Sequence, residues 1–507
     1  MPSPRLSAVA AAVAAVCFST AAAGAQTEPG ANALTIYSTA RPGAVSPELY
    51  RYGGRGQAVP GYAVVRHERD LELTRGRNTV RFSDVAALID PTTVAFESLT
   101  DPKGTRVVEQ NFQFDLVNNE KLLQKYIDRT ITVDQIRGNG VESFTGTLLS
   151  TAGALVLRRP DGSIQTLPHN AGVKLPELPG GLITRPTLVW DIAAGRGGVH
   201  KTRVSYQTTG ITWWADYNLT YSEGANANLC KLDVGAWVSI LNQSGAGYPE
   251  AKLKLIAGDV QRAQPPGRAV PEAMAARALA MEDQAAGFAE KAFFEYHLYT
   301  LGRATTLPDN STKQIELFPA ARGVPCEKTL VYSGAAGRNY GSGPMTDRNY
   351  GIQGNKKVDV YLGFKNAQEN HMGMPLPSGR IRVSKLDDAD KSLEFIGEDV
   401  IDHTPKNEKV LIKLGSAFDV VGERRQVNFS IDTSRKTMTE EIEIKLRNQK
   451  TESVAVIVKE NLYRWSNWQI TAKNHDFGKQ DARTIHFPVK VAAGGETVVR
   501  YTVQYTW

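Results

Sequence analysis

A carboxylate and an imidazole lie two residues apart in Glu295-Tyr296-His297, a spacing that could support acid–base or metal chemistry. On a β-strand, residues i and i+2 point to the same face, so Glu295 and His297 would face the same way. That arrangement suits a general acid and base, or two ligands of a metal ion. An exposed strand face with a hydrogen-bonded pair explains the same residues and is the favoured interpretation.

A second cluster lies in the stretch GEDVIDHTP, where Glu398 and Asp399 precede Asp402 and His403. Several carboxylate oxygens and one imidazole could hold a divalent cation. Asp side chains also accept hydrogen bonds from nearby backbone N–H groups in turns. We favour a polar turn here, with metal binding as the alternative.

A third candidate is His371-Met372-Gly373-Met374, in which two thioethers follow an imidazole. Soft sulfur ligands beside a histidine suit copper(I). Methionine also fills gaps in apolar cores, and Pro375 follows directly, so a rigid packing turn is the favoured interpretation of His371, Met372 and Met374.

Aromatic residues form the fourth group, which could stack on sugar rings or anchor a protein partner. Trp213 and Trp214 are neighbours in the chain, so on a strand they point to opposite faces. We therefore expect one of the two in the core and the other available for binding. Trp237 lies nearby, and Trp465 and Trp468 occur in the stretch YRWSNW.

Cys230 and Cys326 form an even pair once Cys17 is assigned to a leader segment. In an oxidising compartment such a pair favours a disulfide. Two separate buried thiols explain the sequence equally well, and both interpretations stay open.

Common catalytic motifs are absent from the sequence, which contains no GxSxG, HExxH, CxxC or phosphate-binding loop, and no GxGxxG between a strand and a helix. The commonest hydrolase, metalloprotease, redox and nucleotide-binding classes are therefore disfavoured. No cofactor is predicted. A catalytic site assembled from distant residues remains open.

The segment Tyr206–Val260 organises the rest of the chain. Apolar residues alternate with polar ones from Trp213 to Tyr221, from Leu232 to Ile240 and from Ala251 to Ala257, which indicates three strands. Turn-forming residues separate the second strand from the third. The pattern predicts a central antiparallel meander with one buried face.

The same segment resembles a family of secreted proteins named domain of unknown function 4139. The resemblance is carried by GITWWADY, GAWVSILNQSGAGYPEAKLKLIAGDV, EYHLYTL, KNAQENHMGMPLPSGRIRV and FIGEDVIDHTPKNEKVLIKLGSAFDVVGERR, and it extends from about Leu188 to the C-terminus. It implies membership of a family with no established reaction. Mucoidy-inhibitor-like relatives carry a coiled coil ahead of this domain, and no such heptad run is present here.

The remaining patterns predict an all-β protein of several domains. An N-terminal β-rich domain covers residues 26–198 and includes a short helix over Glu120–Tyr126. A central β domain covers 199–355, with a flexible insertion at 262–290 that is rich in alanine and proline. Strands with regular turn spacing over 356–507 predict a C-terminal immunoglobulin-like or fibronectin-like β-sandwich.

The N-terminus reads as a signal peptide of residues 1–25, with one basic residue, an apolar stretch and small residues before Gln26. We expect an exported protein, periplasmic or extracellular, with no integral membrane span after cleavage. Net charge is +6, or +5 without Arg5, which indicates no nucleic-acid partner. The leading hypothesis is a non-enzymatic envelope protein that binds or scaffolds a protein or glycan. A glycan or peptide hydrolase and a metal-binding envelope protein are the alternatives.

Overall fold

The structure is a computed structural model in which the described residues are 32–38, 45, 59–115, 117–137, 140–168, 171–177, 179–180, 182–258, 260, 288–335, 343–352 and 354–507. The predicted signal peptide, its cleavage point before Gln26 and most of the predicted insertion, residues 262–287, lie outside them. Most of the described chain forms β-strands in several sheets, which confirms the predicted all-β, multi-domain fold class.

An eight-stranded sheet forms the first layer of the N-terminal half. Its first strand pairs in parallel with a strand more than 200 residues later, so Leu34 lies opposite Leu253. The sheet therefore draws on both the N-terminal region and the central segment. Its strands are β1 (Asn32–Tyr37), β2 (Tyr62–Leu73), β4 (Ile89–Ser98), β12 (Gly198–Thr208), β15 (Tyr248–Ala257), β16 (Phe288–Phe293), β17 (Tyr296–Leu301) and β18 (Thr305–Leu307).

A three-stranded sheet packs beside this layer, in the order β3 (Gly76–Ser83), β11 (Thr187–Ala194) and β5 (Arg106–Gln113). Phe82 and Trp190 project from it into the same core as Val65 and Tyr206 of the larger sheet. Every second residue of β11 is buried, as expected for a strand that covers one core face.

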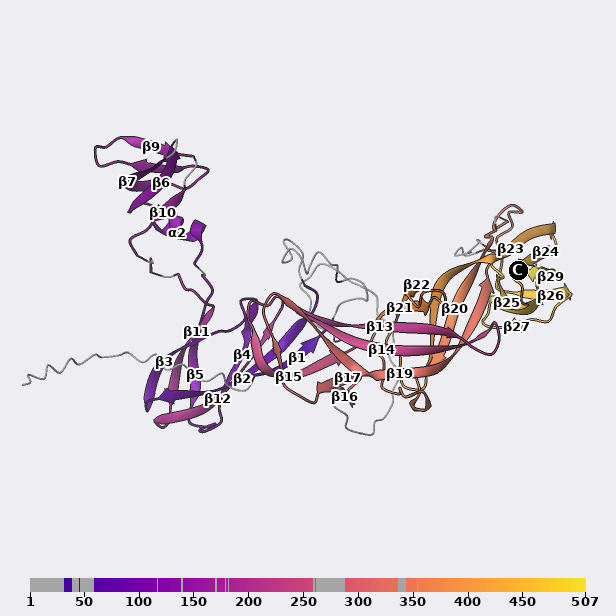
Figure 1. Ribbon diagram of the computed structural model, residues 1–507, viewed down its shortest axis with the longest axis horizontal. Helices are drawn as coiled ribbons and strands as arrows, with labels where there is room; N and C mark the ends of the chain where they lie inside the picture. Colours follow the sequence, from indigo (N-terminus) through magenta and orange to yellow (C-terminus); the bar gives the residue numbers. More distant parts are fainter. Residues whose placement is uncertain are drawn as a thin grey trace, which may run out of the picture.

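A five-stranded sheet with its own small core stands apart from the other sheets in Figure 1. The one α-helix among the described residues, α2 (Asn119–Lys125), belongs to it and begins where the Asn118 side chain accepts a hydrogen bond from Lys121 N at 2.9 Å. The sheet order is β10 (Gly172–Lys174), β6 (Thr130–Arg137), β7 (Gly140–Ser150), β8 (Leu155–Arg158) and β9 (Ile164–Leu167).

A thirteen-stranded sheet forms the rest of the molecule. Strands β13 and β14 pair along their whole length, and β14 then pairs with the long strand β19. The strands are β13 (Ile211–Glu223), β14 (Leu229–Asn242), β19 (Ser311–Tyr332), β20 (Lys357–Lys365), β21 (Gly379–Leu386), β22 (Leu393–Ile401), β23 (Lys409–Asp432), β24 (Thr437–Asn448), β25 (Val454–Asn461), β26 (Trp468–Lys473), β27 (Gly478–Lys479), β28 (Thr484–Val491) and β29 (Glu496–Thr506), and the 3₁₀ helix η1 covers Gln368–Asn370.

All three strands of the predicted meander form, but the third has different neighbours. Strand β15 pairs with β1 and β17 in the eight-stranded sheet, whereas β14 pairs with β13 and β19. The turn after Asn242 therefore carries the chain from one sheet into the other. Periodicity reports which side of a strand is buried, and it carries no information about which strand lies alongside.

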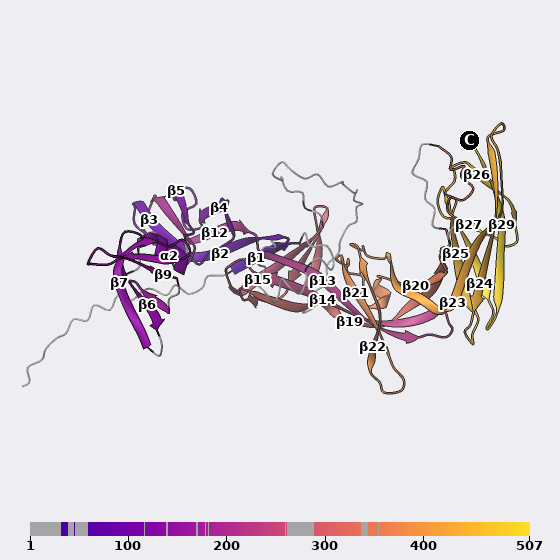
Figure 2. The ribbon, with the colours of Figure 1, turned by 90° about the horizontal axis from the view of Figure 1, so that it is seen from above.

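The C-terminal strands enclose a second core as a two-layered β-sandwich. One layer contains β24, β29 and β26, and the other contains β25, β28 and β27. Side chains from both layers, including Ile442, Phe487 and Tyr501, meet in this core. In two perpendicular views the molecule is elongated, with this sandwich at one end and the N-terminal sheets toward the other (Figures 1 and 2).

Candidate functional site

The predicted acid–base pair in the eight-stranded sheet is not formed as expected. Glu295 lies in the turn between β16 and β17 and is exposed, because the strand begins one residue later, at Tyr296. The acid that reaches His297 is Glu290 of the paired strand, with 2.7 Å between its Oε1 and His297 Nδ1. Glu290 also belongs to the predicted flexible insertion, but residues 288–290 form the start of β16.

The Asp399–His403 cluster bonds to the backbone. Asp399 accepts hydrogen bonds from Val400 N at 2.8 Å and from Lys413 N at 2.6 Å. His403 Nδ1 accepts from Ser378 N at 3.0 Å, and the carbonyl of Asp402 accepts from Thr404. Among the described residues, no three His, Cys, Asp or Glu side chains gather in a way that could hold a metal ion.

The stretch from His371 to Met374 forms a tight turn after η1. His371 is exposed and has a left-handed backbone with φ 56°. Met372 and Met374 are partly buried and pack against the main core. The thioethers therefore serve packing in this structure.

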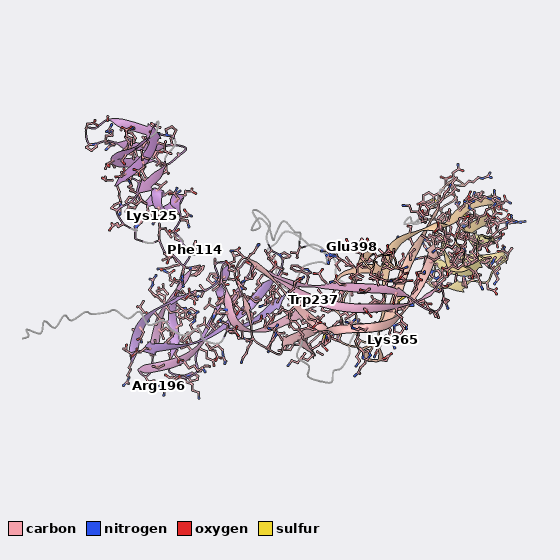
Figure 3. The ribbon with its side chains drawn as sticks, in the orientation of Figure 1. Phe114, Lys125, Arg196, Trp237, Lys365 and Glu398 are labelled. Carbon is pink, nitrogen blue, oxygen red and sulfur yellow. A yellow bond between two sulfur atoms is a disulfide. The ribbon has the colours of Figure 1, made fainter. Side chains whose placement is uncertain are left out.

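The tryptophan prediction needs correction, because Trp213 and Trp214 are both buried, at 2% and 7% exposure. Trp213 faces the main core, while Trp214 packs with Val45 and Leu241 on the other face. Of the tryptophans in this segment, Trp237 is the most exposed, at 38%, and Figure 3 labels it midway along the molecule.

The other two tryptophans lie in the C-terminal sandwich. Trp465 and Trp468 pack against its core as partly buried side chains. Trp468 also donates a hydrogen bond to Ala482 O at 2.8 Å, and the Lys479 ammonium lies 5.0 Å from its ring centre. Both rings therefore have intramolecular packing roles.

Cys230 and Cys326 face each other directly on the paired strands β14 and β19. The structure joins them by a disulfide, with their Cα atoms 4.8 Å apart. This bond links residues separated by 96 positions in the sequence. It lies within the main core rather than in a pocket.

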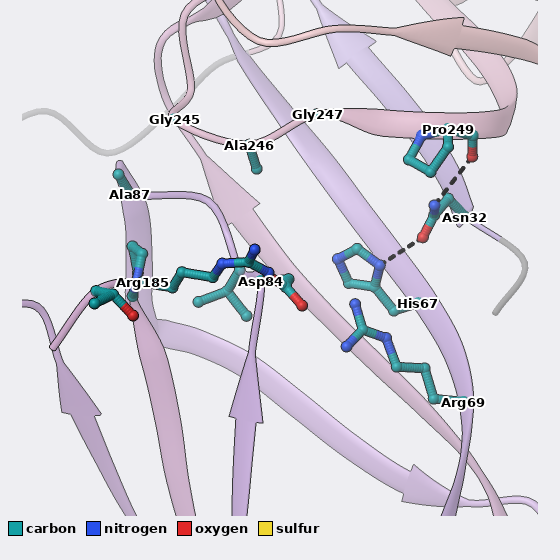
Figure 4. Close-up of a pocket in the computed structure, with 13 residues that line it drawn as sticks. Asn32, His67, Arg69, Asp84, Ala87, Arg185, Gly245, Ala246, Gly247 and Pro249 are labelled. Atoms are coloured by element: carbon teal, nitrogen blue, oxygen red, sulfur yellow. Dashed lines mark hydrogen bonds and ion pairs between the residues drawn. The ribbon is translucent and has the colours of Figure 1, made fainter. Parts of the chain in front are cut away.

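A pocket of about 530 Å³ lies between the eight-stranded sheet, the three-stranded sheet and the turn that joins β14 to β15. Strand β2 contributes His67 and Arg69, and the end of β3 leads into Asp84. Figure 4 shows these side chains converging with Arg185 and with the backbone of residues 245–247. None of these residues was among the sequence candidates.

A continuous chain of hydrogen bonds fixes His67 at the base of this pocket. Asn32 Nδ2 donates to Pro249 O at 3.1 Å, so its Oδ1 faces His67 Nδ1 at 2.6 Å (Figure 4). Tyr206 Oη accepts from Ala86 N at 3.2 Å and lies 3.0 Å from His67 Nε2. The Asn32 oxygen requires a proton on Nδ1, and the Tyr206 hydroxyl can donate to an unprotonated Nε2, an arrangement that matches a neutral ring.

The surroundings of His67 keep it neutral. Burial, together with the positive charge of Arg69, lowers the pKa of His67 from 6.5 to about 3, although Asp84 acts in the opposite direction. Both ring nitrogens are committed to neighbours and the side chain is 3% exposed. A histidine held in this way positions its neighbours and is poorly suited to proton transfer at neutral pH.

Arg69 brings a partly buried positive charge to the pocket. Its guanidinium lies 4.5 Å from the ring centre of Phe82 and donates one hydrogen bond, from Nη1 to Ser83 O at 3.3 Å. It forms no ion pair with any residue that the structure describes. Burial lowers the pKa of Arg69, and the negative charge of Asp84 partly offsets that effect.

Asp84 and Arg185 form the outer side of the pocket. Arg185 Nη1 lies 2.5 Å from Asp84 Oδ1, and both side chains are substantially exposed. Asp84 has a left-handed backbone with φ 66°, a conformation that Asp tolerates better than most residues. The pocket therefore contains two cations, one anion and one neutral imidazole, an arrangement suited to binding a charged group.

One signal in the sequence points to this pocket. The sequence of residues 62–73 predicts a strand, observed as β2, in which positions 63, 65, 67, 69, 71 and 73 share a face that carries Ala, Val, His, Arg, Leu and Leu. A histidine and an arginine on the apolar side of a strand are unusual, because buried charges need partners. Asn32, Asp84 and Arg185 carry no comparable signal, because only folding brings them together.

Comparison of the chain with protein-family models, curated proteins and solved structures found no match in any of the three. The resemblance to the domain of unknown function 4139 family therefore remains a prediction. No helix within the described residues is long and apolar enough to cross a membrane.

Proposed function

We propose that this chain is a non-enzymatic, exported binding or scaffolding protein of the cell envelope, and that the pocket around Arg69 is a ligand-binding site. The observation that carries the proposal is the state of His67. Its two ring nitrogens hold Asn32 and Tyr206 in place, and its pKa of about 3 keeps it neutral. The best-placed acid–base group in the pocket is thus occupied by structural hydrogen bonds.

Three further features support export and binding. The N-terminal residues 1–25 have the pattern of a signal peptide, and the later sequence resembles a family of secreted proteins. The disulfide between Cys230 and Cys326 suits an oxidising compartment. Long strands such as β19 give the molecule an extended surface on which an envelope protein or glycan could dock.

A pull-down of the exported protein from envelope extract tests the proposal, with recovered molecules identified by mass spectrometry. We expect a partner or ligand that is recovered chemically unchanged. In parallel, peptide and glycan mixtures are incubated with the wild-type protein and with His67→Gln. Cleavage products that form with the wild type and disappear with His67→Gln would overturn the non-enzymatic assignment.

A further inference from the structure

We propose that the pocket binds a small organic monoanion by its carboxylate group, with Arg69 as the residue that holds the carboxylate. This inference rests on one part of the proposed function, that the pocket is a binding site. It adds the chemical class of the ligand and the residue that selects it.

The free edge of the Arg69 guanidinium is the first support. Phe82 covers one face of the group, and Nη1 is directed to Ser83 O. Nε and Nη2 make no hydrogen bond to any described residue, and these two N–H groups point in parallel along one edge of a planar fork. A carboxylate accepts two parallel N–H bonds from such an edge, which gives a strong and directional contact.

The charges around the pocket favour a single negative charge on the ligand. Arg69 and Arg185 contribute two positive charges, and Asp84 contributes one negative charge. His67 adds none near neutral pH, because its pKa is about 3. A monoanion neutralises the remaining positive charge, whereas a phosphate dianion would leave an excess negative charge beside Asp84.

The other walls indicate an uncharged body for the ligand. Val85, Ala87, Pro186 and Pro249 present apolar groups around the pocket. The volume of about 530 Å³ lies within the range of sites for small molecules. The wall at Gly245 is firmly placed, because its N–H donates to Asp309 Oδ1 at 3.0 Å and a Cβ there would overlap Ala87.

Titration calorimetry with benzoate and with benzamide tests the inference directly. The two probes have the same shape and differ in charge, so a pocket selective for a carboxylate binds benzoate and discriminates against benzamide. Arg69→Gln should weaken benzoate binding by about tenfold or more, the usual effect of losing a charge-assisted hydrogen-bond pair. Arg66→Gln is the matched control, because Arg66 is on the same strand but exposed on its opposite face.

Asp84→Asn provides a second test, in which the expected result is tighter binding and not a loss of binding. Removing this carboxylate leaves Arg69 and Arg185 without an opposing charge, so benzoate should bind severalfold more tightly and phosphate should begin to bind. Equal affinity of wild type and Arg69→Gln for benzoate, with both proteins folded by circular dichroism, would overturn the inference. Weaker benzoate binding by Asp84→Asn would also overturn it.

The two proposals fail in distinguishable ways. If wild-type protein binds benzamide as well as benzoate, the carboxylate inference is wrong while a binding function stands. If benzoate binds and Arg69→Gln abolishes binding, but incubation with the peptide and glycan mixtures reveals cleavage dependent on His67, the inference stands while the non-enzymatic assignment is wrong.

Discussion

At the scale of single residues, the polar side chains buried in this protein define both the pocket and the stability of the C-terminal sandwich. His67 bonds to Asn32 and Tyr206, which are held in turn by the Pro249 carbonyl and the Ala86 N–H. Such a network orders the pocket when all its members are present and costs stability when one is lost.

The first prediction concerns the pH dependence of stability through His67. An unfolded-state histidine has a pKa of about 6.5, whereas the folded protein holds His67 at about 3. Stability from the neutral ring is therefore complete above pH 6.5 and decreases by about 1.4 kcal/mol per pH unit as the pH is lowered between these values. Between pH 7 and pH 5, urea unfolding should show wild type losing about 2 kcal/mol more than His67→Gln.

The exposed His371 offers a control for that experiment, since His371→Gln removes a histidine outside the pocket. Equal loss of unfolding free energy in wild type and His67→Gln between pH 7 and pH 5 would show that His67 takes up a proton in the folded state. The hydrogen-bond chain described above would then be incorrect.

A second buried network lies in the C-terminal sandwich. Arg464 is fully buried and pairs with Glu440, with 3.1 Å between Nη2 and Oε1. Its Nη1 also donates to the carbonyls of Met345 and Asp347, at 3.1 and 2.8 Å, and so anchors the segment before β20. Arg464 is thus a buried charge that connects two parts of the chain more than 100 residues apart.

The second prediction is that Arg464→Met strongly destabilises the protein, because it leaves Glu440 as an unpaired buried charge. The expected cost is about 3–5 kcal/mol in chemical unfolding. Arg77→Met breaks the exposed ion pair with Asp191 and should cost less than about 1 kcal/mol. Similar losses for the two variants would contradict the role assigned to Arg464.

At the scale of elements, alternation of apolar and polar residues predicted many strands closely. Within the predicted C-terminal β-sandwich, alternation predicts strands over residues 379–385 and 497–505, and these are observed as β21, Gly379–Leu386, and β29, Glu496–Thr506. In both, one face is buried against the core, so the period of two is a direct consequence of packing. The helix predicted at 120–126 is likewise observed as α2, with Asn118 as its cap.

The two longest strands could not be predicted in this way. Strand β19 contains Pro319, Gly323 and Pro325, residues that normally interrupt strands, and its pairing with β14 shifts register three times. Within residues 409–432 the sequence pattern predicts two separate strands, 409–414 and 425–430, whereas the structure has one 24-residue strand, β23. Irregular pairing breaks the period of two, although the backbone remains extended.

The third prediction tests the close packing of β23 against β19. A Cβ at Gly422 would overlap the ring of Tyr332, which is fully buried and donates a hydrogen bond to Asn355 O at 2.6 Å. Because that ring cannot move aside, Gly422→Ala should cost about 1–3 kcal/mol in chemical unfolding. Gly235→Ala is the control on β14, where the nearest atom, Asn218 O, is 3.6 Å away. Equal stability of the two variants would contradict the observed packing.

At the scale of the whole molecule, two large cores are connected by strands that belong to both. Strand β19 places Leu317 in the N-terminal core and Tyr332 in the C-terminal core, and β23 does the same with Ile412 and Val420. The thirteen-stranded sheet therefore continues past residue 355 without interruption. Unfolding of either core disturbs strands that the other core needs.

The small five-stranded sheet has a core of its own and shares no strand with the two large cores. Its core residues, such as Val133 and Leu157, form a cluster of their own. The two linking segments contact each other, as Val117 N donates to Ile183 O at 2.9 Å and Ile183 N donates to Asp115 O at 3.0 Å. Figure 3 labels Phe114 at the start of this link and Lys125 within the small unit.

The fourth prediction is that this unit can be removed. Replacing residues 119–180 by a Gly/Ser linker of about eight residues should leave the remaining unfolding transition cooperative and close to its original midpoint, because the two ends already lie together. Thermal unfolding followed by circular dichroism measures this. Aggregation or loss of the cooperative transition would show that the unit supports the two large cores.

The pocket could not be predicted from the sequence because distant parts of the chain form it together. Its side chains come from β1, β2, the segment after β3, the segment before β11 and the turn after β14. These parts meet because β1 pairs with both β2 and β15. Strand periodicity could mark His67 and Arg69 as polar residues on a buried face, but their partners depend on strand pairing that no local pattern encodes.

The proposed role of His67 as a neutral structural residue in a binding pocket is tested most directly by its ¹⁵N chemical shifts. We predict that nuclear magnetic resonance of ¹⁵N-histidine-labelled protein at pH 5 shows His67 neutral, because its pKa is about 3, with the proton on Nδ1 that the Asn32 oxygen requires. Observation of an imidazolium at pH 5, or of a proton on Nε2 near neutral pH, would contradict the account and restore His67 as a candidate acid–base group.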